Sequence, residues 1–229
     1  MRCAVWSFAA LALTLGCGVR PLSPGAGLPA SPLLGPAPPP VREPSSVDEL
    51  LRSRIVRAAR RHAEDVGRRA DGMPLTSPAH AAGEAFAFVR LVLADAGAGT
   101  SASDLIALRG TFLRRGALYR NRLPRLGDLV LFAGTGTRPR GPSHVAVVVG
   151  VAPDGTLEVI GWRRGVVRRD RVNPIHPSSR RLDGRIVNSF VRVIRRDDPP
   201  GTRYLAGELL DGFGDVSVLL PGDGDVAVR

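Results

Sequence analysis

Cysteine is almost absent from this chain of 229 residues. The two cysteines are Cys3 and Cys17, and none occurs after position 17. Because the thiolate is the reactive form of a catalytic cysteine and a common zinc ligand, its absence excludes thiol-dependent hydrolysis from the body of the chain. The histidines share no zinc-ligand spacing either, so we expect no metal and no cofactor; they are His62, His80, His144 and His176.

Lysine is missing altogether, so every basic side chain of this chain is an arginine, and the formal net charge is +11. Such a bias is typical of a GC-rich genome. A basic surface attracts anionic partners such as lipid headgroups or cell-wall polymer. In the body of the chain the arginines are spread from Arg52 to Arg229, and aromatic residues, only 5% of the chain, do not interleave with them. Nucleic acid is therefore not an expected partner.

Long apolar runs are also lacking, and the only candidate is 4–15, near the N-terminus. A membrane-spanning helix needs about 20 apolar residues, whereas this run has the length of the apolar core of a signal peptide. We therefore expect residues 1–17 to be a signal peptide. Its end, Thr14-Leu15-Gly16-Cys17, resembles a bacterial lipobox, in which the cysteine receives lipid. The alternative is an ordinary secretory peptide that is cleaved near Gly16.

Residues 18–45 are rich in proline and show no helical or strand period, which indicates a semi-rigid spacer. A lipid on Cys17 would tether the following domain to a membrane through this spacer. The expected location is the cell envelope, either as an outer-membrane lipoprotein or in the periplasm.

The body of the chain predicts an α+β fold, because helical patterns come first and an antiparallel sheet follows. A capping box of Ser46 and Glu49 starts the first helix. The expected helices are 47–67, 83–97 and 103–116, with a short closing helix at 204–213. The expected strands are 127–133, 144–152, 156–162, 165–172 and 185–194.

Three segments of this body share a pattern: GEAFAFVRLVLADAG at 83–97, PRLGDLVLF at 124–132 and SHVAVVVG at 143–150. Together they resemble the NlpC/P60 group of papain-like cell-wall hydrolases, which is related to the CHAP amidases. The resemblance implies a papain-like domain over 46–198, with a short helix and tail over 199–229.

In that family a cysteine begins a buried helix, a histidine on the sheet acts as base, and a third polar residue orients the histidine. Matching Phe88-Val89-Arg90 to the family's motif puts Ala85 at the cysteine position. The third position falls near Gly161 and Trp162, which leaves His144 alone. Substitute nucleophiles would be Thr76, Ser77 or Ser143, but Ser143 neighbours His144 on a strand and should point to the opposite face.

Two functions follow from the resemblance. The first is a non-catalytic module whose old cleft, around Ala85, Phe86, His144 and Trp162, binds a peptidoglycan stem peptide or an envelope protein. The second is an active cell-wall peptidase or amidase that uses His144 and a displaced nucleophile. A third interpretation is that the likeness is a convergent pattern in an exported α+β domain.

Overall fold

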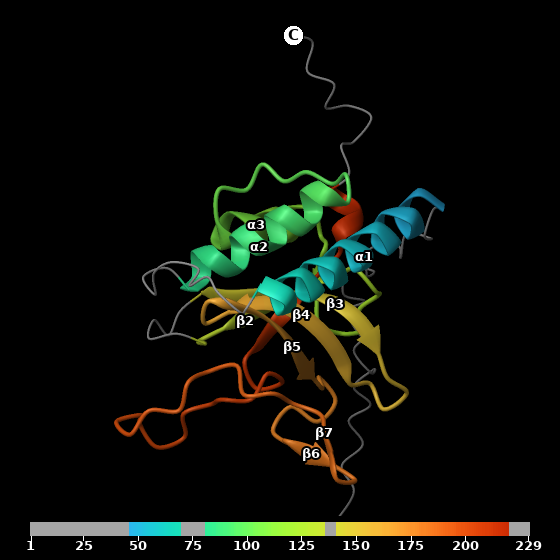
Figure 1. Cartoon of the computed structure of the whole chain (residues 1–229). Coiled ribbons are helices and arrows are strands. Elements are labelled where there is room, and N and C mark those ends of the chain that lie inside the picture. Colours follow the sequence, from blue (N-terminus) through green and yellow to red (C-terminus); the bar gives the residue numbers. More distant parts are fainter. Residues whose placement is uncertain (1–45, 70–80, 136–140, 220–229) are drawn as a thin grey trace, which may run out of the picture. The chain divides into compact units, whose positions relative to one another are not determined.

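The computed structural model describes residues 46–69, 81–135 and 141–219. Within them the α-helices come first and an antiparallel sheet follows, so the predicted α+β class is confirmed (Figure 1). The expected signal peptide over 1–17, with Cys17, and the spacer over 18–45 lie outside the described residues.

The helices begin and end close to the predicted positions. They are α1 (Ser46–Arg69), α2 (Ala81–Asp95) and α3 (Leu105–Arg114). The N-cap of α3 is Asp104, whose carboxylate accepts a hydrogen bond from the Ala107 backbone at 2.8 Å. In the described ranges no helix is both long and apolar enough to cross a bilayer.

The main sheet has the strand order β1-β8-β2-β3-β4-β5, and all neighbouring strands are antiparallel. Four of its strands were predicted. The six strands are β1 (Leu118–Tyr119), β8 (Leu210–Gly214), β2 (Leu129–Ala133), β3 (Pro142–Val151), β4 (Leu157–Arg163) and β5 (Val166–Val172).

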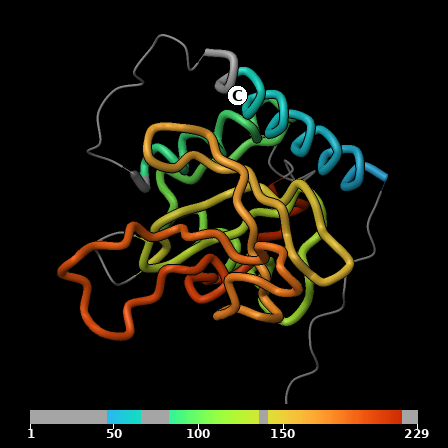
Figure 2. Tube along the Cα trace, turned by 60° about the horizontal axis from the view of Figure 1, so that its bottom comes forward, coloured from blue at the N-terminus to red at the C-terminus, as the bar shows by residue number. Residues whose placement is uncertain are grey.

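Both faces of the sheet are covered. Because side chains alternate along a strand, Val145, Val147 and Val149 of β3 pack with the helices, while Ala146 and Val148 pack on the opposite face. That second face is covered by the chain between β5 and β8, which includes the hairpin of β6 (Arg181–Leu182) and β7 (Arg185–Ile186). Figures 1 and 2 show this segment, in orange and red, on the side away from the helices.

Two predicted elements are wrong. The strand over 185–194 is limited to the short β7 and a single bridge between Phe190 and Leu205. No ladder forms there because the backbone N–H groups bond separate partners: Ser189 donates to Arg171 and Val191 donates to Tyr204.

The closing helix expected over 204–213, within the C-terminal tail, is a turn followed by strand β8. This strand lies between β1 and β2, where both of its edges find backbone partners, and the 3-10 helix η2 (Val216–Leu219) follows. Residues after 198 therefore supply an interior strand of the main sheet.

Candidate functional site

The first turn of α2 holds the position that the resemblance assigns to the nucleophile. Ala85 occupies it, and its side chain is fully buried in the core between the helices and the sheet. Phe86, expected to bind a ligand, is only 4% exposed, and the Arg90 guanidinium lies 5.9 Å from its ring centre. Neither Ala85 nor Phe86 therefore presents a surface to a ligand.

Trp162, at the end of β4, reaches the same turn of α2. Its indole Nε1 donates a hydrogen bond to Glu84 Oε2 at 3.1 Å, and the indole is half-buried. The second carboxylate oxygen of Glu84 forms no hydrogen bond with any residue in the described ranges. Among the described residues, an unpaired carboxylate oxygen thus lies beside a half-buried indole.

His144 lies on the other face of the sheet. It points to the same side as Ala146 and Val148, and its ring centre is 5.6 Å from that of Phe132, which packs in the same cluster. Burial, together with the positive charge of Arg163, lowers the pKa of His144 to about 4. The imidazole is therefore neutral at physiological pH.

The expected cleft around Ala85, Phe86, His144 and Trp162 is consequently not one site. Glu84 and Trp162 meet on the helix side, Ala85 and Phe86 are enclosed in the core of that side, and His144 faces the opposite layer. The family resemblance implied that these four residues surround one cleft. The sequence could not assign each residue to a face of the sheet. Alternation along a strand shows which side chains share a face, but not which layer covers that face.

Substitute nucleophiles are not available to His144 in the described part. The Ser143 hydroxyl donates to the Phe132 carbonyl at 3.3 Å, accepts from the Thr135 N–H at 2.9 Å and contacts the Thr135 hydroxyl at 2.8 Å. As predicted from strand alternation, Ser143 and His144 are adjacent and point apart. Thr76 and Ser77 lie outside the described residues.

Two other histidines lie in the described ranges. His176 is exposed, whereas His62 is half-buried and its Nε2 lies 2.8 Å from Asp95 Oδ2. His80 lies outside the described residues. Within the described ranges, no three potential metal ligands come together.

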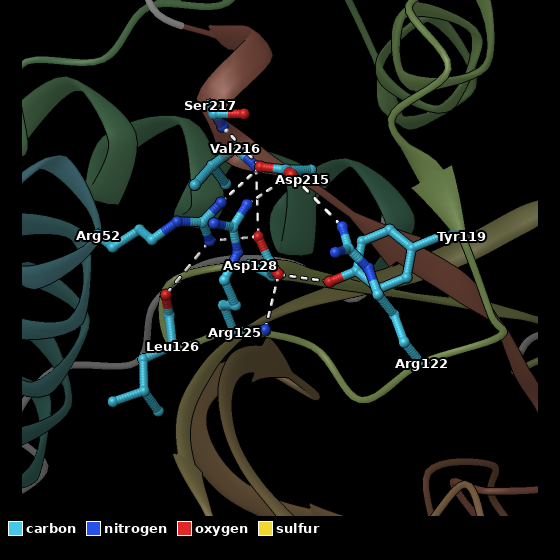
Figure 3. A network of polar contacts seen from close by, with 9 residues as sticks. All are labelled: Arg52, Tyr119, Arg122, Arg125, Leu126, Asp128, Asp215, Val216 and Ser217. Atoms are coloured by element: carbon cyan, nitrogen blue, oxygen red, sulfur yellow. Dashed lines mark hydrogen bonds and ion pairs between the residues drawn. The ribbon is translucent and has the colours of Figure 1, made fainter. Parts of the chain in front are cut away.

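A buried ionic network, which the sequence did not reveal, joins α1, the turn before β2 and the C-terminal segment (Figure 3). Arg52 Nη1 donates to Asp128 Oδ1 at 2.5 Å, and Arg52 Nη2 donates to Asp215 Oδ1 at 2.5 Å. Asp128 is fully buried and also accepts hydrogen bonds from the Tyr119 hydroxyl and the Arg125 backbone, at 2.5 and 2.8 Å. Its carboxylate is thus held by three separate segments.

The second carboxylate of this network, that of Asp215, is reinforced from the turn before β2 and from η2. Arg125 Nη2 donates to it at 2.9 Å and the Ser217 backbone donates at 3.0 Å. Burial alone would raise the pKa of Asp215, but the hydrogen bonds from Ser217 and the charges of Arg52 and Arg125 lower it overall. The network is structural, since its charged groups pair with one another.

Gly127 allows α1 to approach this turn. Its φ of +85° lies in the left-handed region, and a Cβ there would come within 3.0 Å of the Arg52 Cα atom. Arg52 can therefore reach Asp128 only because position 127 carries no side chain.

Comparison with known protein families, with curated proteins and with solved structures finds no match to this chain.

A fall in pH from 6.5 to about 4 is expected to cost about 3 kcal/mol of folding stability through His144. The folded pKa lies below the unfolded one, so in this window the unfolded chain binds a proton that the folded protein does not. The contribution of His144 to folding stability is complete above the pKa that His144 has in the unfolded chain. It is lost as the pH falls towards the pKa of His144 in the folded protein. Urea unfolding at both ends of the window measures the loss.

The control is His144→Gln, which should remove this part of the pH dependence, whereas His176→Gln at an exposed site should keep it. Equal pH dependence in the wild type and His144→Gln would show that His144 is not held neutral in the fold.

Proposed function

We propose that this protein is an exported, lipid-anchored envelope protein whose α+β domain is a non-catalytic relative of the NlpC/P60 cell-wall hydrolases. The observation that supports the non-catalytic part of this proposal is the separation of positions 85 and 144 by the sheet. Ala85 is buried in the helix-side core and His144 packs on the other face. Lipidation of Cys17 and export remain part of the proposal.

The chemistry of acyl transfer supports a non-catalytic role. A nucleophile must lie within hydrogen-bond reach of its base, and a third group must orient that base. The His144 ring forms no hydrogen bond with the residues that the structure describes, so nothing there orients it. A reactive side chain at position 85 would still be separated from His144 by the sheet.

The ligand of this module is proposed to be a peptidoglycan stem peptide or a peptide segment of an envelope protein. Glu84 and Trp162 would bind it at the start of α2. The Glu84 oxygen that does not bind Trp162 suits an ammonium group, and the indole offers an apolar face beside it. Both side chains belong to the helix side of the sheet.

Trp162→Ala is expected to reduce binding to purified sacculi about tenfold, as the loss of a central aromatic contact does. Co-sedimentation of the full chain with sacculi measures it. Because Trp162 also packs on the core, Glu84→Gln, which removes the charge alone, serves as a second variant. The matched control is Ile175→Ala, an exposed residue outside the site.

Unchanged binding in both Trp162→Ala and Glu84→Gln would rule out this surface as the binding site. Failure of the wild type to bind sacculi, together with failure to crosslink to any envelope protein, would overturn the proposed binding function.

A further inference from the structure

One stripe of α1 faces away from the core and carries two kinds of side chain. Its positions follow one another at intervals of three and four residues, which keeps them on one side of a helix. The stripe consists of Val47, Leu50, Arg54, Arg57 and Arg61. Val47 is 57% exposed and Leu50 is 49% exposed, and the three arginines are exposed as well.

The arginines of the stripe line a hollow of about 440 Å³ between α1 and the last turn of α2, where Asp95 and Gly97 form the opposite wall. Asp95 lies 3.4 Å from Arg61 and 2.8 Å from His62. Arg54 and Arg57 form no ion pair or hydrogen bond with any residue in the described ranges. The hollow therefore has two guanidinium groups whose charge no carboxylate of the described chain offsets.

We propose that the stripe of α1 lies on a bilayer that contains anionic phospholipids, with headgroup phosphates in the hollow beside Arg54, Arg57 and Arg61. This inference rests on the proposed membrane tether. Guanidinium groups bind phosphate oxygens through pairs of N–H donors. Exposed aliphatic side chains that share a helix face with arginines are typical of helices that lie in the interface of a membrane.

The composition of the stripe favours a lipid surface over other occupants. A free phosphate would make no use of Val47 and Leu50. A second copy of α1 would bring like charges together at Arg54 and Arg57, which is unfavourable. The position of α1 also fits, since it is the first described element after the spacer proposed to follow Cys17. The stripe ends before Glu64, so the contact involves the first four turns of the helix.

A fluorescent label on Leu50→Cys tests the inference. The full chain also carries Cys3→Ser and Cys17→Ser, so the introduced thiol is unique and lipidation plays no part. Vesicles contain a nitroxide-headgroup quencher in phosphatidylcholine alone or in an equimolar mixture with phosphatidylglycerol. We expect quenching only in the mixture, with higher salt weakening it. A label on Ile175→Cys, exposed on another part of the chain, should not be quenched.

The arginines are tested in the same labelled chain. Arg54→Gln with Arg57→Gln should lower the affinity for the mixed vesicles about thirtyfold, because each basic residue near an anionic surface contributes about fivefold. Arg196→Gln with Arg203→Gln removes the same charge from an exposed segment and should have little effect. Circular dichroism at rising temperature shows whether both double variants stay folded.

The inference is overturned by equal quenching in both kinds of vesicle, by no quenching in the mixture, or by equal effects of the two double variants. A change in label emission without vesicles, which grows with protein concentration, would show that the stripe contacts a second copy of the chain. That result would also overturn the inference. None of these outcomes bears on the separation of Ala85 from His144 or on binding to sacculi, so the proposed function is tested separately.

Discussion

Asp128→Ala is expected to lower the free energy of unfolding by about 4 kcal/mol, because it leaves the Arg52 guanidinium buried with only part of its compensating charge. Arg52 lies on α1, Asp128 precedes β2 and Asp215 follows β8, so the loss affects three distant segments together. The Tyr119 hydroxyl and the Arg125 backbone lose their acceptor too. Thermal unfolding of the full chain should show a fall in Tm of roughly 10 °C.

Asp211→Ala provides the matched control. Asp211 also accepts from an arginine, Arg109, at 2.6 Å, but both side chains are partly exposed. An exposed ion pair contributes about 1 kcal/mol or less, so this variant should unfold close to the wild type. If Asp128→Ala and Asp211→Ala had equal effects, the buried network would not hold α1 to the C-terminal segment.

Asn188→Ala is expected to be destabilising to a similar extent, by about 4 kcal/mol, because four hydrogen bonds, two of them buried and two partly buried, disappear with one side chain. Asn188 is fully buried in the layer that covers His144. Its Oδ1 accepts from the backbone N–H groups of Asn173 and Gly207, and its Nδ2 donates to the carbonyls of His176 and Ser179, all at 2.8 to 2.9 Å. Urea unfolding at neutral pH measures the effect.

Gly207 shows how closely this layer packs around Asn188, since a Cβ at that position would meet the Pro177 Cα atom at 2.5 Å. The neighbouring backbone therefore has little room to turn its polar groups towards other partners once Asn188 is removed. Asn121→Ala, at an exposed position, is the control and should change stability by less than about 0.5 kcal/mol. Equal stability of Asn188→Ala and the wild type would contradict the assigned role.

Local signals account for the elements that the sequence predicts. The apolar period of α2 and the Asp104 cap each act within a few residues, and the matching helices form. The runs rich in Val and Leu over 127–172 likewise form β2 to β5, because their hairpin partners are adjacent in the sequence.

Strand β8 could not be predicted in this way. Its sequence, Leu-Asp-Gly-Phe-Gly, has two glycines, which weaken strand formation, and its partners β1 and β2 are some 80 or more residues away in the chain. Packing requires a glycine at position 214, because a Cβ there would lie 2.4 Å from the Phe112 ring. No local sequence pattern reveals this requirement. Strand β8 therefore forms because of its tertiary contacts and not because of its local sequence.

The same limit applies to the candidate site. The resemblance grouped Ala85, His144 and Trp162 around one cleft, but the faces they occupy depend on which side of the sheet the helices cover. The side that the helices cover depends on the apolar residues of the whole core. Val145 packs with the helices, and the neighbouring His144 therefore points to the opposite face. Arg52, Asp128 and Asp215 were missed because residues this far apart leave no pattern of spacing.

Release of muropeptides from purified peptidoglycan tests the central claim most directly. The full chain is incubated with sacculi as the wild type, as His144→Ala and as Ala85→Cys, and the soluble products are separated by chromatography. We expect no release by any of the three, including Ala85→Cys, because the sheet keeps position 85 from His144. Release by the wild type that disappears in His144→Ala would show an active hydrolase and would contradict the non-catalytic role.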